Sequence, residues 1–328
     1  MSNLSDHKEE TAPVRMGFHV SVSPAQMAFY IILVIMGILG NATVIWVIGK
    51  SIFLERNWGR ISDIIILNMA LSNLLISLLR NMLLVISDIG LELNTIKGFC
   101  QLLMGVWMWL RSVNVWSTLF LSAFHLQMLK RVAPTTANGP RGVPKTFLVS
   151  LGLIWIVNLI YSIPAYIFST NGGRNTTETL MLVSTTTRPL LGCIWNFPST
   201  YSGLAYATTS LVIHEAVPIM LMVVTNLTSL YTLYSHGRSS GKDAPALKRV
   251  PAEKRAAKVI LALVMLFIIS WGTNVISVNY FNYNRGSSVA FLLVIARFGH
   301  ITFIAMSPVV LAVGHRQLRS CIRSALVH

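Results

Sequence analysis

The sequence predicts an all-α membrane protein, a bundle of seven transmembrane helices. Its 328 residues are 54% hydrophobic and 11% charged, with a mean hydropathy of +0.64. Because soluble domains carry about 25% charged residues, this composition excludes a soluble enzyme or binding domain. A helix needs roughly 20 apolar residues to cross a bilayer. Seven stretches reach this length, at about 27–49, 62–86, 101–128, 146–168, 204–234, 257–282 and 289–313.

Positive charge is distributed unevenly between the two sides of this bundle. The loops after the first, third and fifth helices and the C-terminal tail hold 17 of the 26 Lys and Arg residues, whereas the opposite side holds 6. Since cytoplasmic loops are enriched in Lys and Arg, the N-terminus (1–26) is predicted to be extracellular. The helical domain then spans 27–313, and the tail (314–328) is cytoplasmic. The net charge of +15 therefore indicates a cytosolic membrane face and not a nucleic-acid-binding protein.

The first two helices carry polar residues within apolar runs. Gly40 and Asn41 lie in the first helix, and Asn68 and Asn73 lie in the second. Within a membrane, glycine permits close helix packing and asparagine hydrogen-bonds to neighbouring helices, so these positions are interpreted as structural. Arg80, toward the outer end of the second helix, can extend to the membrane interface. A ligand contact is the alternative role for this arginine.

The third helix has a charged residue, Arg111, near its middle. An ionised side chain there costs about 2.5–3.5 kcal/mol on insertion scales, so it should face the bundle interior and meet a partner. Glu215, beside His214 in the fifth helix, is the only acidic residue well inside any of the seven stretches. Glu215 is therefore the expected partner of Arg111 or of Arg297 in the seventh helix. Because burying an ion pair adds little stability, the pair indicates a ligand site or switch, with a structural contact as the alternative.

Two cysteines and two glycosylation sequons lie on the predicted outer side. Cys100 begins the third helix, and Cys193 lies late in the outer loop 169–203, which can act as a lid without being strongly structured. Disulfides persist on the oxidising side, so we expect these cysteines to pair. Asn3 and Asn175 begin Asn-x-Ser/Thr sequons and can be glycosylated. Cys321 is expected in the cytoplasm, either lipidated or as an inert thiol.

Seven helices, an outer N-terminus and this cysteine pair resemble the rhodopsin-like G-protein-coupled receptors. Asn73 stands where the main branch has an acidic residue, and residues 124–126 (Phe-His-Leu) replace its acid-Arg-Tyr motif. Residues 307–311 (Ser-Pro-Val-Val-Leu) replace its Asn-Pro-x-x-Tyr motif. This pattern resembles the vomeronasal type 1 receptors and their fish counterparts, the olfactory receptors related to class A. Further matching positions are Asp63, Cys100, Arg111, Val113, Thr118, Leu121, Ser122, Cys193, His214, Glu215, Leu233, Tyr234, Pro251, Arg255 and Ala256.

The resemblance implies a chemosensory receptor of the plasma membrane. Such a receptor detects a small odorant or pheromone-like molecule in olfactory neurons and signals through an inhibitory-type heterotrimeric G protein, without a cofactor. His125 and Trp271, where the family often has Gln and Tyr, favour a fish-type member. Helical spacing places Met104, Trp107, Met108 and Arg111 on one face of the third helix.

From these considerations we expect two functional surfaces. The ligand pocket is predicted to be lined by Trp107, Met108 and Arg111, with His214, Glu215 and Trp271 opposite and Arg297 nearby. The G-protein face is predicted to comprise His125, Lys130, Arg131, Lys254 and Arg255.

Other functions fit the sequence less well. Bitter taste receptors are distantly similar, but they generally lack the cysteine pair. A transporter would show inverted repeats or paired broken helices, and neither is clear here. A membrane enzyme would need a catalytic cluster, and no His or Cys metal-ligand spacing is present. A retinal-binding photoreceptor requires a lysine in the seventh helix, and 289–313 contains none.

Overall fold

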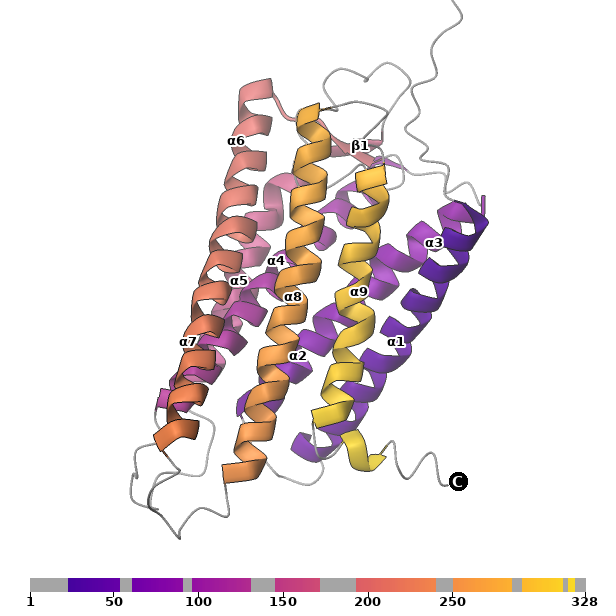
Figure 1. Cartoon of the computed structure of the whole chain (residues 1–328). Helices are drawn as coiled ribbons and strands as arrows, with labels where there is room; N and C mark the ends of the chain where they lie inside the picture. The colour runs from indigo at the N-terminus through magenta and orange to yellow at the C-terminus, as the bar shows by residue number, and fades with distance from the viewer. Residues whose placement is uncertain are drawn as a thin grey trace, which may run out of the picture.

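The computed structural model describes residues 23–53, 61–90, 96–130, 145–171, 193–239, 250–284, 291–314 and 318–321. Within these ranges, seven long helical spans stand side by side (Figure 1). The single-element spans are α1 (Pro24–Phe53), α4 (Lys97–Lys130), α5 (Lys145–Ile167), α8 (Val250–Asn284) and α9 (Phe291–Gly314). The second span comprises α2 (Ile61–Ile76), η1 (Ser77–Asn81) and α3 (Met82–Asp88), and the fifth comprises α6 (Thr200–Leu211), η2 (Val212–Ala216) and α7 (Val217–Ser239). The predicted seven-helix bundle is confirmed, with most helices a few residues longer than their apolar stretches.

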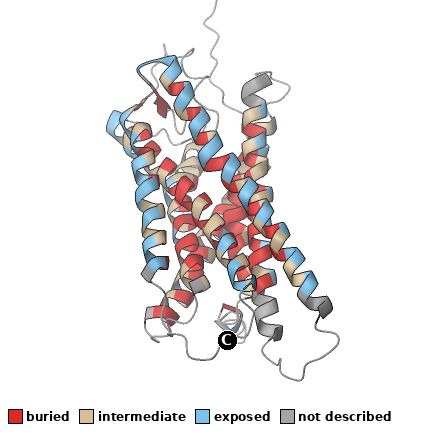
Figure 2. Cartoon of the chain, turned by 90° about the vertical axis from the view of Figure 1, so that its left-hand side faces the viewer, coloured by how far each residue is buried: buried red, intermediate tan, exposed pale blue. Residues whose placement is uncertain are grey.

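The helices divide into an inward and an outward face. Figure 2 shows buried residues lining the interior and exposed residues on the outer surface. Large apolar side chains such as Trp46 and Ile276 are 72% and 70% exposed, which is the arrangement expected when lipid, not water, surrounds the bundle. By length and composition, six spans in the described part of the chain can cross a membrane, and α4 is not among these six.

The α4 helix occupies the centre of the bundle. It packs against α2, α5, α7 and α8, and buried residues occur along most of its length, from Cys100 to His125. A helix in this position is shielded from lipid by its neighbours, so it can carry the polar side chains Arg111 and Asn114 without facing hydrocarbon.

One end of the bundle is closed by a short sheet and a disulfide. Strand β1 (Ser169–Asn171) pairs antiparallel with β2 (Cys193–Trp195), so the two ends of the predicted lid are more structured than expected. Cys193 is bonded to Cys100 at the start of α4, with a Cα–Cα distance of 5.3 Å. This confirms the predicted disulfide, and we call this end of the molecule the disulfide end. Asn3 and Asn175 lie outside the described residues.

A buried layer of polar side chains connects the helices between the middle of the bundle and the end opposite the disulfide. Asn73 donates to Ser307 Oγ at 3.3 Å and accepts from Asn114 at 2.5 Å, and Asn41 donates to the carbonyl of Ile304 at 3.0 Å. These contacts join α1, α2, α4 and α9, the structural role that the sequence predicted for Asn41 and Asn73.

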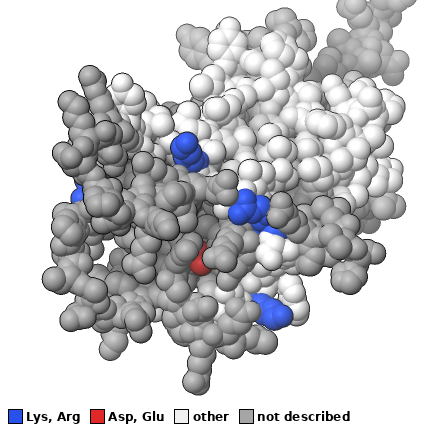
Figure 3. Space-filling view, turned by 60° about the horizontal axis from the view of Figure 1, so that its bottom comes forward, with Lys and Arg blue, Asp and Glu red and all other residues white. Residues whose placement is uncertain are grey.

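The end of the bundle opposite the disulfide carries scattered positive charge. Figure 3 shows blue basic side chains distributed over this end. The basic side chains described here include Lys50, Lys130, Lys258 and Arg319. We call this the basic end, and it corresponds to the side predicted to face the cytoplasm.

Candidate functional site

The centre of the bundle contains a buried ion pair between α4 and η2. Arg111 Nη2 lies 2.5 Å from Glu215 Oε1, and Arg111 Nε donates to the same oxygen at 2.7 Å. The second carboxylate oxygen, Glu215 Oε2, accepts a hydrogen bond of 2.5 Å from the indole nitrogen of Trp271 in α8. The side chains of Arg111 and Glu215 are 4% and 2% exposed. Of the two partners predicted for Glu215, Arg111 is the one that it contacts in the structure. Together with Trp271, the pair connects α4, η2 and α8.

A π-helical turn presents Glu215 to this pair. In η2 the helix is locally wider than an α-helix, and both His214 and Glu215 are buried there although they are adjacent in the sequence. Such π-bulges are rare in helices and occur frequently at functional sites. The wider turn lets two consecutive side chains face the interior, which a regular helix with 3.6 residues per turn does poorly.

His214 lies in a different contact from Glu215. Its ring stacks on Tyr161 of α5, with 3.7 Å between ring centroids, and its Nδ1 accepts a 3.3 Å hydrogen bond from the indole nitrogen of Trp116. His214 therefore holds η2 against α4 and α5, whereas Glu215 holds it against α4 and α8.

Aromatic residues surround the guanidinium of Arg111. Its Cζ lies 4.5 Å from the Trp271 ring centroid and 5.7 Å from that of Trp107. Trp107 and Met108 are both buried, and they lie one helical turn from Arg111 on α4, in the direction of Cys100. Cation–π contacts of this kind are stronger when desolvated, so the aromatic walls help to hold an arginine inside the bundle.

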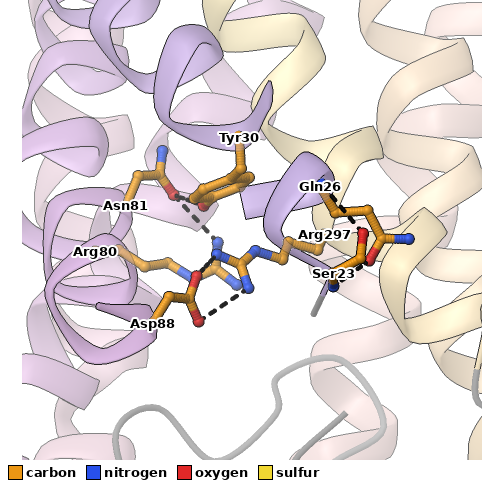
Figure 4. A network of polar contacts seen from close by, with 7 residues as sticks. All are labelled: Ser23, Gln26, Tyr30, Arg80, Asn81, Asp88 and Arg297. Carbon is orange, nitrogen blue, oxygen red and sulfur yellow. Dashed lines mark hydrogen bonds and ion pairs between the residues drawn. The ribbon is translucent and has the colours of Figure 1, made fainter. Parts of the chain in front are cut away.

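Arg297 lies apart from Glu215 and forms a second ion pair. It contacts the carboxylate of Asp88 at the end of α3, and its Cζ lies 3.9 Å from the ring centroid of Tyr30 in α1 (Figure 4). Tyr30 in turn donates to Asn81 Oδ1 at 3.2 Å. The two side chains of the pair are 15% and 19% exposed, so this network links three spans nearer to the surface than the central pair.

The comparison with known proteins decides the family. The family described as "7 transmembrane receptor (rhodopsin family)" matches residues 40–307. The chain is also 40% identical over 304 residues to Olfactory receptor class A-like protein 4 of Danio rerio, covering 90% of this chain and 88% of the relative. The chain belongs to the rhodopsin family of seven-transmembrane receptors.

Two receptors of lower identity match smaller parts of the chain. Neuropeptide Y receptor type 6 of Oryctolagus cuniculus is 23% identical over 251 residues, covering 74% of this chain and 63% of that receptor. Bombesin receptor subtype-3 of Ovis aries is 25% identical over 258 residues, covering 75% of this chain and 59% of that receptor. The family is one of receptors, so this chain is a multi-pass membrane receptor and not an enzyme.

The residues predicted for the G-protein face are described only in part. His125 is buried near the end of α4, and Lys130 is exposed at its last position. Arg131 lies outside the described residues, and only the backbone of Lys254 and Arg255, within α8, is described. The assignment of these five residues to the G-protein face therefore stays a prediction.

Two further residues, Arg80 and His300, contact the aromatic rings around the ion pair. We call the group formed by Arg80, Trp107, Arg111, Glu215, Trp271 and His300 the central cluster. The sequence analysis named a ligand contact only as the alternative role of Arg80 and did not place His300 in the pocket. Arg80, expected to be able to reach the interface, lies with its Cζ 4.3 Å from the Trp107 ring centroid. His300 of α9 packs its ring against Trp107 and Trp271, at centroid distances of 5.3 and 5.2 Å. Arg80 belongs to the π-helical turn η1, and nothing in the apolar pattern of this segment signals such a turn.

Proposed function

We propose that this receptor detects small organic molecules, odorants or pheromone-like cues, between the middle of its helix bundle and the disulfide end. It signals through a heterotrimeric G protein of the inhibitory type, at the plasma membrane, with its N-terminus outside the cell. The observation that carries the proposal is the buried Arg111–Glu215 pair, which Trp271 joins from a third helix. The printed name of the fish relative, an olfactory receptor class A-like protein, supports a chemosensory role.

The pair has the properties of a switch. A buried ion pair contributes little net stability, because the cost of removing both charges from water offsets their attraction. Disturbing one partner leaves the other charge buried and uncompensated, so an arrangement with the pair formed and one with it broken differ in free energy. A ligand that binds Arg111 or Glu215 changes the relative free energies of these states, and only such differential affinity can drive activation.

Trp107 and Trp271 flank the guanidinium of Arg111, and Met108 is proposed to line the pocket with them. Ligand sites are typically apolar cavities with a small number of placed polar groups that fix orientation. His214 supports the site indirectly, through its contacts with Tyr161 and Trp116. Arg297, paired with Asp88, is proposed to act at the edge of the pocket. At the other end, His125, Lys130, Arg131, Lys254 and Arg255 are proposed to meet the G protein.

The experiment is a signalling screen in cells that co-express a promiscuous G protein. Panels of small carboxylic acids, amines and neutral analogues are applied to the wild type, to Arg111→Ala and to Glu215→Gln, at equal surface expression. Lys97→Gln serves as the control, because Lys97 is an exposed charge at the disulfide end. We expect a response that both pocket variants lose and the control keeps. Unchanged ligand responses and basal activity in both variants would contradict the proposal.

A further inference from the structure

A groove lies between α8 and α9 on the outer surface of the bundle. The two helices pack against each other and stand side by side (Figure 1), and the groove has a volume of about 340 Å³. Its lining includes Ile269, Thr273, Ile295, Phe298, Gly299 and Thr302. Because Ile269 and Ile295 are exposed, the groove is continuous with the apolar surface that faces lipid.

Close backbone contact fixes the floor of this groove at Gly299. A Cβ atom there would lie 3.0 Å from the backbone oxygen of Ser270 and 3.5 Å from the backbone nitrogen of Asn274. Asn274 also donates through its side-chain nitrogen to the carbonyl of Ala296 at 2.7 Å, which joins α8 to α9. The groove is therefore a preformed concavity held by contacts between the two helices.

The groove lies in the half of the bundle nearer to the disulfide end. Val294, one of its lining residues, begins the segment of α9 that can cross a membrane. In the proposed orientation this segment begins at the outer leaflet. Ser270 and Gly299 line the groove and directly precede Trp271 and His300, so the groove and the central cluster share the same helical turns.

The threonine hydroxyls of the groove can accept hydrogen bonds but have no proton to offer. Thr273 Oγ1 donates to the carbonyl of Ile269, and Thr302 Oγ1 donates to the carbonyl of Phe298, both at 2.7 Å. A hydroxyl has one proton, so toward the groove each oxygen can only accept. Beside Gly299, the side-chain oxygen of Asn274 is buried and has no donor among the described residues. An occupant that brings a hydrogen-bond donor is therefore favoured.

The position of the groove and its hydrogen-bonding capacity restrict the occupant to one class of lipid. A groove that opens into the bilayer is filled from the bilayer. The acyl chains of phosphatidylcholine carry no donor, whereas a sterol combines one hydroxyl with a rigid apolar ring system. A rigid molecule also loses less conformational freedom than a flexible chain when it enters a preformed site.

We propose that this groove binds a sterol from the outer leaflet. The sterol hydroxyl donates to a threonine oxygen of the groove, Thr273 or Thr302, and the ring system packs on Ile269, Ile295 and Phe298. This site is separate from the proposed ligand pocket, and it lies against the outer side of the helices that supply Trp271 and His300.

Photolabelling of the full-length receptor in phosphatidylcholine nanodiscs tests the proposal. The probe is cholesterol that carries a photoreactive diazirine, and mass spectrometry identifies the labelled peptides. The competitors are unlabelled cholesterol and cholest-4-en-3-one, in which a carbonyl replaces the hydroxyl. Thr273→Trp fills the groove, and Ile276→Trp is the control, because Ile276 is an exposed residue of the same helix outside the groove lining.

We expect the probe to label α8 and α9, and Thr273→Trp to lose most of this labelling while Ile276→Trp keeps it. The loss of one hydrogen bond should make the ketone compete roughly 2–10-fold less well than cholesterol. The double variant Thr273→Val/Thr302→Val keeps the shape of both side chains and removes both hydroxyls. It should no longer distinguish cholesterol from the ketone.

Three results would overturn the inference. Equal labelling of α8 and α9 in Thr273→Trp and Ile276→Trp would place the sterol elsewhere. A ketone that competes as well as cholesterol in the wild type would remove the role of the hydroxyl. Labelling of the same peptides by phosphatidylcholine with a diazirine in its acyl chain, undiminished by cholesterol, would make a phospholipid the occupant. Should Thr273→Trp fail to fold, the two competitions in the wild type still decide.

Discussion

Arg111 and Glu215 lie 104 residues apart in the sequence and 2.5 Å apart in the structure. The α4 helix supplies the arginine, the π-helical turn η2 supplies the carboxylate, and Trp271 of α8 donates to the oxygen that Arg111 does not bind. Three helices therefore meet in one buried polar contact. A relative movement of any one of them must break or rebuild hydrogen bonds at Glu215.

Removing one member of this pair should destabilise the receptor more than removing both. Breaking a buried pair from one side costs about 3–5 kcal/mol, whereas replacing both members with apolar residues is often neutral. The double variant Arg111→Met/Glu215→Leu should therefore unfold at a higher temperature than either single variant. Thermal unfolding of the purified receptor measures this. A double variant that loses as much as the two single variants combined would show that the two side chains do not interact.

Gly40 is required where α1 approaches α9. A Cβ atom at this position would lie 2.8 Å from Pro308 Cβ and Cγ, whereas a Cβ at Gly49 would meet nothing within 4 Å. Overpacking costs about 1–3 kcal/mol, so Gly40→Ala should lower the unfolding temperature. Gly49→Ala, on the same helix, is the matched control and should be neutral or slightly stabilising. Equal effects of the two substitutions would mean that the contact with Pro308 does not constrain α1.

The pair between Arg297 and Asp88 should tolerate exchange of its charges. Asp88→Arg and Arg297→Asp each place two like charges together, so each should lower surface expression and unfolding temperature. The double exchange should recover most of the loss, because it restores the opposite charges. The pair is partly exposed, so the recovered stability should be about 1 kcal/mol or less. Failure of the double exchange to recover would assign the arginine's role to its contact with Tyr30.

Loss of the disulfide should loosen the disulfide end. Cys100→Ser/Cys193→Ser removes a cross-link that spans 93 residues, and loss of a native disulfide typically costs about 2–5 kcal/mol. The unfolding temperature should fall accordingly, and reducing agent should then have no further effect. Cys321→Ser is the control, because Cys321 lies at the basic end and is not disulfide-bonded. A receptor that unfolds at the same temperature without the bond would show that the helices alone fix this end.

The sequence predicted the bundle because long apolar runs leave few alternatives in a membrane. It also predicted that Glu215 would pair with an arginine, since it is the only acidic residue well inside a predicted helix. It could not select Arg111 over Arg297, because Asp88 lies at the boundary between the second helix and the following loop. Only the folded arrangement brings Asp88 to Arg297.

The sequence did not predict the π-helical turns η1 and η2. Their segments, Ser77–Asn81 and Val212–Ala216, lie within long helical spans, and the wider turn changes the direction in which their side chains point. In η1 that direction brings Arg80 to Trp107, although its position in the sequence equally suits contact with the membrane interface. Which residues meet in the central cluster therefore depends on how the helices turn and pack.

Nucleotide exchange on a purified inhibitory-type G protein tests the central claim most directly. The wild type, Glu215→Gln and the control Lys97→Gln are compared without ligand, at equal amounts of folded receptor. If Glu215 restrains Arg111 in the resting state, Glu215→Gln weakens the pair and should raise basal exchange above that of the wild type and the control. Basal exchange equal to the wild type, with an unchanged ligand response, would show that the pair is a structural contact and not a switch.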